Sequence, residues 1–181
     1  MNSKLKPFDI IVAVDQKNGI GKNGGLPWSL SEDMQHFKKV TTQTQDSLKK
    51  NAVVMGRKTW ESIPDKFRPL PDRVNVVLTR NSEFLLPEGV IRADSLESAC
   101  NQLKDDRIEK IFVVGGASIY AQALESEMCE SIYLTRIFKD FECDTFFPSI
   151  EIQFKEIESS EEKSQDDLTY CFSSYKNNKF L

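Results

Sequence analysis

Asp33 places a carboxylate on the apolar face of a predicted helix. The segment Ser29–Glu32 (SLSE) has the form of a capping box, which predicts that a helix begins near Leu30. The apolar residues that recur at helical spacing are Leu30, Met34, Phe37 and Val40. A carboxylate among them is costly unless it is paired or protonated. Asp33 is therefore a candidate proton donor or ligand for the polar edge of a substrate; the alternative is a first-turn aspartate that only stabilises the helix dipole.

Two predicted strands end in glycine directly before a helix. Residues 53–60 (VVMGRKTW) and 113–120 (VVGGASIY) both follow this pattern, which leaves backbone N–H groups free to bind an anion. Arg57 and Lys58 add positive charge to the first, and residues 79–80 (TR) end a third strand. Each turn alone is equally consistent with tight packing. Several at one sheet edge favour a ligand with several phosphates, such as a dinucleotide.

The glycines at positions 19, 21 and 24 match the pattern GxGxxG, but we do not interpret them as a Rossmann fingerprint. That motif requires a helix to open at its third glycine, and here Gly25 and Pro27 follow instead. We expect residues 15–28 to form a long mobile loop whose glycines let a ligand or lid approach closely. An ordinary surface loop is the alternative.

The composition excludes several classes of protein. The chain has 181 residues, with 24 Lys and Arg against 28 Asp and Glu, and a net charge of −4 that disfavours nucleic-acid binding. It contains no long apolar run that would predict a transmembrane helix. Residues 1–14 lack a small-residue cleavage site, so we expect no signal peptide, a cytoplasmic protein and no membrane partner.

The cysteines and the single histidine give no metal-binding pattern. The cysteines are Cys100, Cys129, Cys143 and Cys171, with no CxxC pair, so we expect no metal site. Their wide spacing predicts free, partly buried thiols, and two disulfides in a secreted protein are the alternative. His36 falls in a polar position of its predicted helix, which favours a surface location.

The hydrophobic pattern predicts one α/β domain over residues 1–181. Strands are predicted at 8–14, 52–55, 73–79, 90–91, 110–114 and 131–138, and helices at 30–41, 57–63, 95–103 and 117–124. This alternation predicts a largely parallel sheet with flanking helices. Residues 154–158 and 168–175 have no helix between them, so they predict a C-terminal antiparallel hairpin at the sheet edge. We expect the polar connector 159–167 to be a solvated turn.

These segments, in this order, resemble the dihydrofolate reductase family over nearly the whole chain. The motifs that carry the resemblance are 11–14 (IVAV), 19–28 (GIGKNGGLPW), 54–64 (VMGRKTWESIP), 68–73 (RPLPDR), 113–116 (VVGG) and 144–148 (DTFFP). The resemblance implies a mainly parallel eight-stranded sheet. It also implies hydride transfer from NADPH to dihydrofolate, which yields tetrahydrofolate for one-carbon metabolism and for thymidylate, purine and glycine synthesis.

The same resemblance implies roles at the substrate site. Asp33 would bind the amino-pyrimidine edge of the pterin and assist protonation through water near Trp28, and Thr135 would hydrogen-bond Asp33. Arg73 would pair with the α-carboxylate of folate. The remaining substrate-binding residues would be Ile11, Val12, Met34, Phe37, Lys38, Ile63, Leu70, Val114 and Tyr120. Folate and antifolate inhibitors would bind there too.

For NADPH, the resemblance implies three groups of residues. The nicotinamide would contact Ala13, Gly19, Ile20, Gly21, Lys22, Asn23, Gly24 and Gly25. The phosphates would contact Arg57, Lys58, Thr59, Gly115, Gly116, Ala117, Ser118, Ile119 and Tyr120. Leu78, Thr79, Arg80 and Asn81 would hold the adenosine end, with Asp94 where many eukaryotic members have a basic residue and Arg92 as a compensating cation. The Gly115–Gly116 peptide is expected to be cis.

Three other functions are weighed against this one. An NADPH-binding sensor without turnover would not need Asp33, Thr135 and Arg73 together. A reductase of a riboflavin-pathway intermediate would have little use for Arg73. The chain could also be one half of a bifunctional reductase–thymidylate synthase, but its ending, residues 170–175 followed by a few polar residues, favours a stand-alone enzyme, which we expect to be a monomer.

Overall fold

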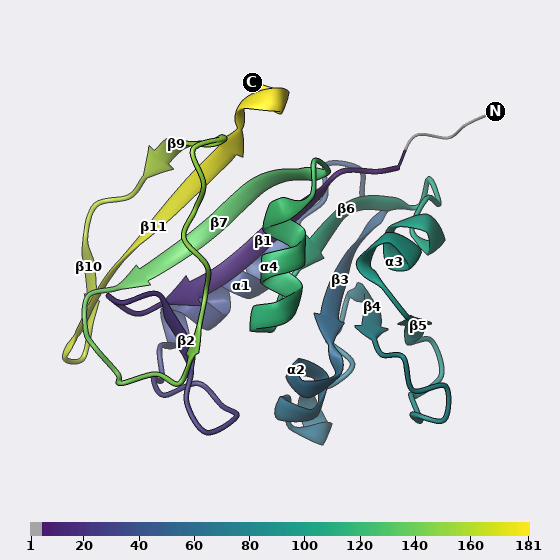
Figure 1. Ribbon diagram of the computed structural model, residues 1–181, viewed down its shortest axis with the longest axis horizontal. Helices are drawn as coiled ribbons and strands as arrows, with labels where there is room; N and C mark the ends of the chain where they lie inside the picture. The colour runs from purple at the N-terminus through teal and green to yellow at the C-terminus, as the bar shows by residue number, and fades with distance from the viewer. Residues whose placement is uncertain (1–4) are drawn as a thin grey trace.

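The computed structural model describes residues 5–181, and residues 1–4 of the predicted domain lie outside the described residues. A large sheet is flanked by helices (Figure 1). Its strands are β1 (Phe8–Val14), β3 (Lys50–Gly56), β4 (Arg73–Leu78), β5 (Ile91–Ala93), β6 (Ile108–Val113), β7 (Cys129–Ile137), β9 (Phe154–Ser159), β10 (Lys163–Gln165) and β11 (Leu168–Asn177). The helices are α1 (Ser31–Thr42), α2 (Arg57–Ser62), α3 (Leu96–Gln102) and α4 (Ala117–Glu125), with short 3-10 turns at Asp65–Phe67 and Asn178–Phe180.

The centre of the sheet is parallel, which confirms the predicted α/β class. Strands β7, β1, β6, β3, β4 and β5 are neighbours in that order, and each adjacent pair is parallel. The apolar runs of β1 and β3 are buried along nearly their whole length because helices cover both faces of the sheet. Parallel pairing brings the carboxyl ends of these strands to one edge.

The C-terminal segment adds antiparallel strands, as predicted. β11 pairs with β7 on one side, and on its other side with β10 and then β9. Because β9 and β10 occupy successive stretches of the same edge of β11, the sheet is eight strands wide. The connector 159–167 is largely exposed, as predicted, but it is not all turn, because residues 163–165 pair with β11 and the turn that joins β10 to β11 is formed by Asp166 and Asp167.

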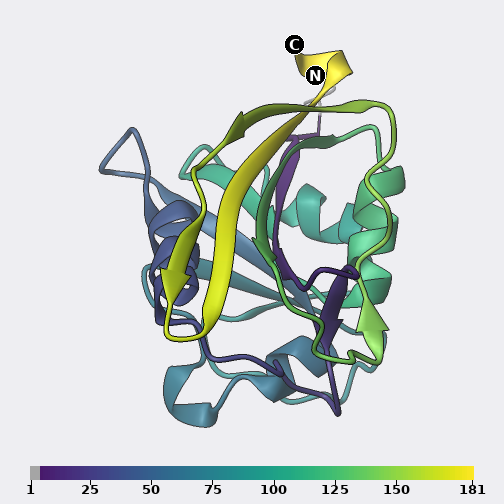
Figure 2. The ribbon, with the colours of Figure 1, turned by 90° about the vertical axis from the view of Figure 1, so that its left-hand side faces the viewer.

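Two layers of helices enclose the sheet. Helix α1 lies on one face, and α3 and α4 lie on the other (Figure 2). Side chains of β1 alternate between these layers: Ile10 and Val12 join the core that contains Ala123 of α4, whereas Ile11 joins the core against which Phe37 of α1 packs. The α1 face carries the candidate site residues Asp33 and Thr135, which are in contact.

The N-terminus of α1 differs from its predicted form. The helix begins at Ser31, and within residues 5–181 its N-cap residue Leu30 provides no side-chain cap, so the predicted capping box is wrong. The side chain of Gln165 serves instead: its Oε1 accepts hydrogen bonds from the Ser31 hydroxyl (3.0 Å) and from the backbone N–H of Glu32 (3.1 Å). The cap comes from a strand more than a hundred residues away.

Two side chains of α1 also depart from their predicted environments. Met34 is 57% exposed, so it does not belong to the buried part of the predicted apolar face. His36 is half-buried rather than on the open surface, because its ring stacks on Phe172 of β11 at 3.9 Å between ring centres.

The glycine-rich segment after β1 is partly ordered into a strand. Gly19–Gly21 form β2, which pairs antiparallel with β8 (Thr145–Phe146). The rest of residues 15–28 consists of turns and loop, as expected for a long loop, and the short strand pairing is the part that the sequence did not predict. No helix opens at Gly24, and the next helix begins at Ser31, which confirms that the GxGxxG pattern is not a Rossmann fingerprint.

The cysteines agree with the prediction of free, partly buried thiols. All four cysteines, each of which lies among the described residues, are free, with Cys100 and Cys129 buried and Cys143 and Cys171 half-buried. In residues 5–181, no helix is long and apolar enough to cross a membrane. Over the same residues, no cluster of three or more His, Cys, Asp or Glu side chains is placed to hold a metal ion.

Candidate active site

The carboxyl ends of the parallel strands carry the predicted cofactor turns. β3 ends at Gly56 and continues into α2, β6 is followed by Gly115–Gly116 and α4, and β4 is followed by Thr79. Because β6, β3 and β4 are adjacent in the sheet, these three turns lie side by side at one edge (Figure 1). This is the edge at which open α/β sheets bind their ligands.

Asp33 is held on the sheet by Thr135. The hydroxyl of Thr135, on β7, donates a hydrogen bond of 2.6 Å to Oδ1 of Asp33. Burial raises the pKa of the Asp33 carboxyl, and this hydrogen bond acts in the opposite direction. The predicted Asp33–Thr135 pair is therefore confirmed as a contact, and the carboxyl holds a proton more readily than an exposed aspartate does.

The two glycine turns touch one another. The backbone N–H of Gly56 donates to the carbonyl of Gly115 at 2.9 Å, and the Gly115–Gly116 peptide is cis, as expected. A Cβ on Gly115 or Gly116 would lie 3.4 Å from the hydroxyl of Thr59, and Gly115 also has a φ of +122°. Glycine is required at Gly115 because its backbone is left-handed there.

Tyr120, on α4, lies close to the Gly115 turn and connects two elements of the fold. Its hydroxyl is buried and donates to the carbonyl of Ile11 at 2.9 Å, which ties α4 to β1. Burial, and to a smaller extent the charge of Asp33, raises the pKa of the Tyr120 hydroxyl. Tyr120 is therefore a neutral side chain that ties α4 to the middle of β1.

Arg73 is a buried cation at the start of β4. Its Nε donates to the carbonyl of Pro71 and one terminal nitrogen donates to the hydroxyl of Thr41, both at 2.9 Å, and its guanidinium lies 5.9 Å from the ring centre of Phe37. Among residues 5–181 it forms no ion pair with a carboxylate. Burial lowers its pKa, an effect that nearby Asp72 partly offsets. Such a fork is suited to a ligand carboxylate.

The glycine-rich segment is fastened to the segment that follows β7. The carboxylate of Asp15 accepts backbone hydrogen bonds from Lys17 (2.8 Å), Gly19 (2.7 Å) and Phe141 (3.1 Å). Burial alone would raise the pKa of Asp15, but these hydrogen bonds outweigh it and lower the pKa. A Cβ on Gly19 would lie 2.4 Å from the Cβ of Cys143, so only glycine fits at this crossing.

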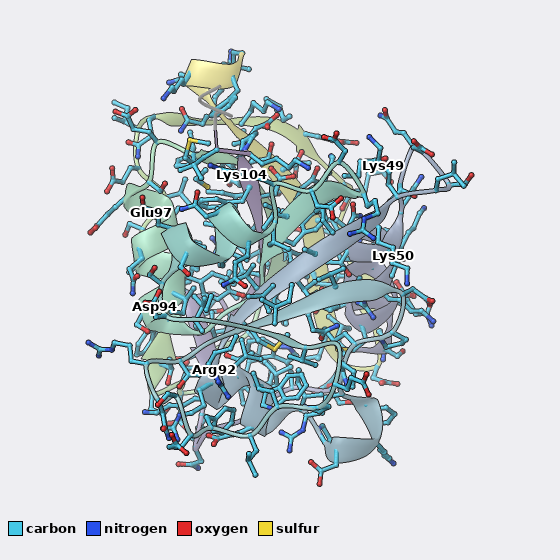
Figure 3. The ribbon with its side chains drawn as sticks, turned by 90° about the vertical axis from the view of Figure 1, so that its right-hand side faces the viewer. Lys49, Lys50, Arg92, Asp94, Glu97 and Lys104 are labelled. Carbon is cyan, nitrogen blue, oxygen red and sulfur yellow. The ribbon has the colours of Figure 1, made fainter. Side chains whose placement is uncertain are left out.

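The predicted adenosine end lies beside β5. Thr79 follows β4, and its hydroxyl accepts from the backbone N–H of Asn81 at 3.1 Å. Arg92 lies on β5 and Asp94 follows it directly (Figure 3); Arg92 donates to the carbonyl of Phe84, and Asp94 accepts from Ser95. The Arg92 side chain is therefore already hydrogen-bonded within the protein. Arg80, which follows Thr79 after β4, is an exposed cation at this edge.

The predicted site residues divide by exposure. The buried ones are Ile11, Val12, Gly19, Trp28, Arg73, Leu78, Gly115, Tyr120 and Thr135. The half-buried ones are Ala13, Ile20, Gly21, Lys22, Asp33, Phe37, Thr59, Ile63, Leu70, Thr79, Val114, Gly116, Ala117 and Ile119. The exposed ones are Asn23, Gly24, Gly25, Met34, Lys38, Arg57, Lys58, Arg80, Asn81 and Ser118. The exposed group contains the cations Lys38, Arg57, Lys58 and Arg80 and part of the glycine-rich segment.

Sequence reasoning missed the residues that hold this site together. Asp15, Asp144 and Gln165 make their contacts across the fold: Asp144 accepts from the backbone N–H of Asn23 at 2.8 Å, and Gln165 caps α1. For Asp15, a carboxylate directly after a buried strand was a usable signal. For Gln165, a polar residue in a solvated connector gave none.

Two cavities lie away from the predicted site. One of about 410 Å³ is lined by Arg136, Phe147 and Tyr175, among others, and one of about 200 Å³ is lined by Asp9, Lys110 and Glu130, among others. Neither is lined by Asp33 or by the glycine turns, so the candidate site rests on the contacts described above rather than on either cavity.

Comparisons with known proteins agree with the fold. The dihydrofolate reductase family model matches residues 7–177. A dihydrofolate reductase from Heliothis virescens is 42% identical over 93% of this chain and 96% of its own length, and one from Drosophila melanogaster is 45% identical over 83% and 84%. The solved structure of Schistosoma mansoni dihydrofolate reductase has a TM-score of 0.83 and 35% identity, covering 96% of this chain and all of that one.

Longer proteins match as well. The bifunctional dihydrofolate reductase-thymidylate synthase of Daucus carota is 45% identical over 94% of this chain, and this chain spans 34% of that protein's length. The match therefore concerns about a third of the bifunctional relatives. Because the family model covers nearly all of the described residues and single-domain relatives are matched along most of their length, this chain belongs to the dihydrofolate reductase family.

Proposed function

We propose that this chain catalyses the NADPH-dependent reduction of dihydrofolate to tetrahydrofolate, which would serve one-carbon metabolism. The observation that carries the proposal is the Thr135–Asp33 hydrogen bond, which holds a half-buried carboxyl beside the carboxyl edge of a sheet with this family's fold. Dihydrofolate has an amino-pyrimidine edge whose paired donors match a carboxylate.

Asp33 would act in binding and in proton supply. Oδ1 accepts from Thr135, which fixes the plane of the carboxyl and directs its remaining lone pairs toward a bound heterocycle. Burial raises its pKa, so the group exchanges a proton at a higher pH than an exposed aspartate. We propose that the proton reaches the pterin ring nitrogen through water near Trp28, whose ring packs against Phe141 at 5.3 Å between centres.

The residues at the carboxyl edge fit a dinucleotide with an added phosphate. When bound, NADPH supplies the hydride. The first residues of α2 and α4, directly after Gly56 and Gly116, present backbone N–H groups, and Lys58 and Arg80 are exposed cations without an ion-pair partner among residues 5–181. Arg80 and Thr79 would hold the adenosine phosphate that distinguishes NADPH from NADH.

Arg73 would hold the far end of the substrate. Its buried guanidinium has no carboxylate partner among the described residues, and it lies beside the ring of Phe37, which would pack on the aminobenzoyl ring. A folate α-carboxylate would supply the missing charge through a bidentate contact. Folate and antifolates that share the amino-pyrimidine edge would compete at the same place.

A direct assay tests the proposal. The purified protein is mixed with dihydrofolate and either NADPH or NADH, and the loss of the near-ultraviolet absorbance of the reduced nicotinamide is followed. We expect consumption that requires dihydrofolate and is faster with NADPH. Absence of consumption with both cofactors would contradict the proposed reaction, and equal rates would contradict the role of Thr79 and Arg80 in cofactor choice.

A further inference from the structure

The C-terminal hairpin supplies the cap of the helix that carries Asp33. Within the described residues Leu30 makes no side-chain cap for α1. Oε1 of Gln165, the last residue of β10, accepts from the Ser31 hydroxyl and from the Glu32 backbone N–H at 3.0 and 3.1 Å. An unsatisfied first turn frays readily, so this side chain closes the end of the helix next to Asp33.

The neighbouring strand of the hairpin contacts α1 twice more. The buried Tyr170 of β11 donates its hydroxyl hydrogen bond to the carboxylate of Glu32, the residue before Asp33. One turn further along, the ring of His36 stacks on Phe172 with ring centres 3.9 Å apart and planes 20° from parallel. These contacts flank Asp33 on both sides along the helix.

Strand β11 also pairs with β7, the strand that carries Thr135, the hydrogen-bond partner of Asp33. Phe172 of β11 is paired with Thr135 of β7, and Tyr170 is paired with Ile137. Thr135, which donates to Asp33, is therefore in fixed register with Tyr170 and Phe172, the β11 residues that contact α1. A rotation of α1 about its axis would break the Asp33–Thr135 contact and the tail contacts together.

We propose that the hairpin of β10 and β11 is a positioning device for Asp33, in which Gln165 and Tyr170 hold the first turn of α1 so that the Asp33 carboxyl stays on Thr135. The proposal rests on the proposed function where it assigns Asp33 to the substrate. Gln165 and Tyr170 are positioning residues, because they act through α1.

The groups around Asp33 determine how its pKa would change if the first turn of α1 were loosened. The polar groups near it are Thr135 of β7, Glu32 of its own helix, Tyr170 of β11 and Tyr120 of α4. Burial is the main cause of its raised pKa. When the first turn frays, the carboxyl gains water, which lowers its pKa, and spends less time hydrogen-bonded to Thr135, which raises its pKa by a smaller amount. The expected signature is a fall in the Asp33 pKa together with weaker binding of dihydrofolate.

Gln165→Ala tests the device, and Ser164→Ala on the same strand is the matched control. Carbon NMR of the Asp33 carboxyl gives its pKa without turnover, and steady-state kinetics give KM and kcat. For Gln165→Ala we expect a lower Asp33 pKa, faster amide exchange at Glu32 and a KM for dihydrofolate raised about 3–10-fold, as for loss of a helix cap. NADPH affinity should stay within about twofold. Ser164→Ala should leave all four unchanged.

The outcomes separate this inference from the proposed reaction. A Gln165→Ala protein that is less stable but keeps the Asp33 pKa and KM would overturn the positioning role. Gln165→Glu, which retains an acceptor at the helix N-terminus, should restore the slow amide exchange, and its failure would count equally against the cap. If the pKa of Asp33 falls but turnover and KM do not change, the device stands and the role of Asp33 in the reaction fails.

Discussion

Asp9 and Asp15 lie at opposite ends of β1, both almost fully buried, and their pKa values shift in opposite directions. Burial raises the pKa of Asp9 to about 6, and Lys110, Lys176 and one backbone N–H offset it only in part. Burial would raise the pKa of Asp15 too, but three backbone N–H groups donate hydrogen bonds to its carboxylate and lower the pKa below its usual value.

The difference shows that, at similar depth, hydrogen-bond donors decide the direction in which the pKa of a buried carboxyl shifts. Asp15 follows the strand's carboxyl end, where a tight turn directs N–H groups at it. Asp9 lies within the strand, where neighbouring strands use the N–H groups. Asp33 is intermediate, with one hydroxyl donor and a raised pKa, which leaves its charge responsive to a ligand.

Asp33→Asn should have the largest effect. The amide has nearly the same shape but cannot accept paired hydrogen bonds or exchange a proton, so turnover should fall about 10²–10⁴-fold. Steady-state assays measure the fall, and NADPH titration of the same protein is the control, with unchanged affinity expected. Turnover near that of the unmodified protein would show that the Asp33 carboxyl has no part in proton supply.

Arg73→Leu tests whether the buried Arg73 guanidinium, which has no carboxylate partner among the described residues, binds the α-carboxylate of dihydrofolate. Loss of a buried charge pair should weaken dihydrofolate binding by about 2–4 kcal/mol, seen as a raised KM. Arg107→Leu is the matched control, because that exposed arginine pairs with Asp105 and should leave KM unchanged. An unchanged KM in Arg73→Leu would rule out the proposed contact.

Asp15→Asn should destabilise the fold. The amide keeps one acceptor oxygen for Lys17 and Gly19, but it turns an NH₂ group toward the N–H of Phe141. Loss of charge-assisted hydrogen bonds should cost about 1.5–3 kcal/mol in free energy of unfolding. Denaturant unfolding at neutral pH measures it. A variant as stable as the unmodified protein would show that the three N–H groups do not favour the charged form.

Asp9→Asn should have the smallest effect, and of the opposite sign. Because the folded pKa of about 6 is above the usual value of 3.8, the unfolded chain loses its proton first as pH rises, and stability falls between about pH 4 and pH 6. The neutral amide removes this loss, so the variant should be more stable at pH 7.5 by about 1–2 kcal/mol. Equal stability of both proteins at pH 4 and pH 7.5 would contradict the shift.

The sequence predicted the parallel centre of the sheet well, because buried apolar runs and strand-ending glycines are local signals. The predicted strands and helices at 8–14, 57–63 and 117–124 correspond to β1, α2 and α4. Around α1 the same local reasoning failed: the SLSE segment has the composition of a capping box, yet the cap is Gln165. A cap supplied by another strand leaves no pattern near the helix that it closes.

The amino-acid sequence alone determined which groups are available: a carboxylate at Asp33, an arginine at Arg73 and glycine turns after buried strands, since each depends on residue type and periodicity. Only the tertiary structure decided which of them meet. Thr135 lies 102 positions from Asp33, and Phe141 lies 126 from Asp15. Such contacts depend on strand order and register, which long-range packing sets, and so they also decide the direction in which the pKa of each buried carboxyl shifts.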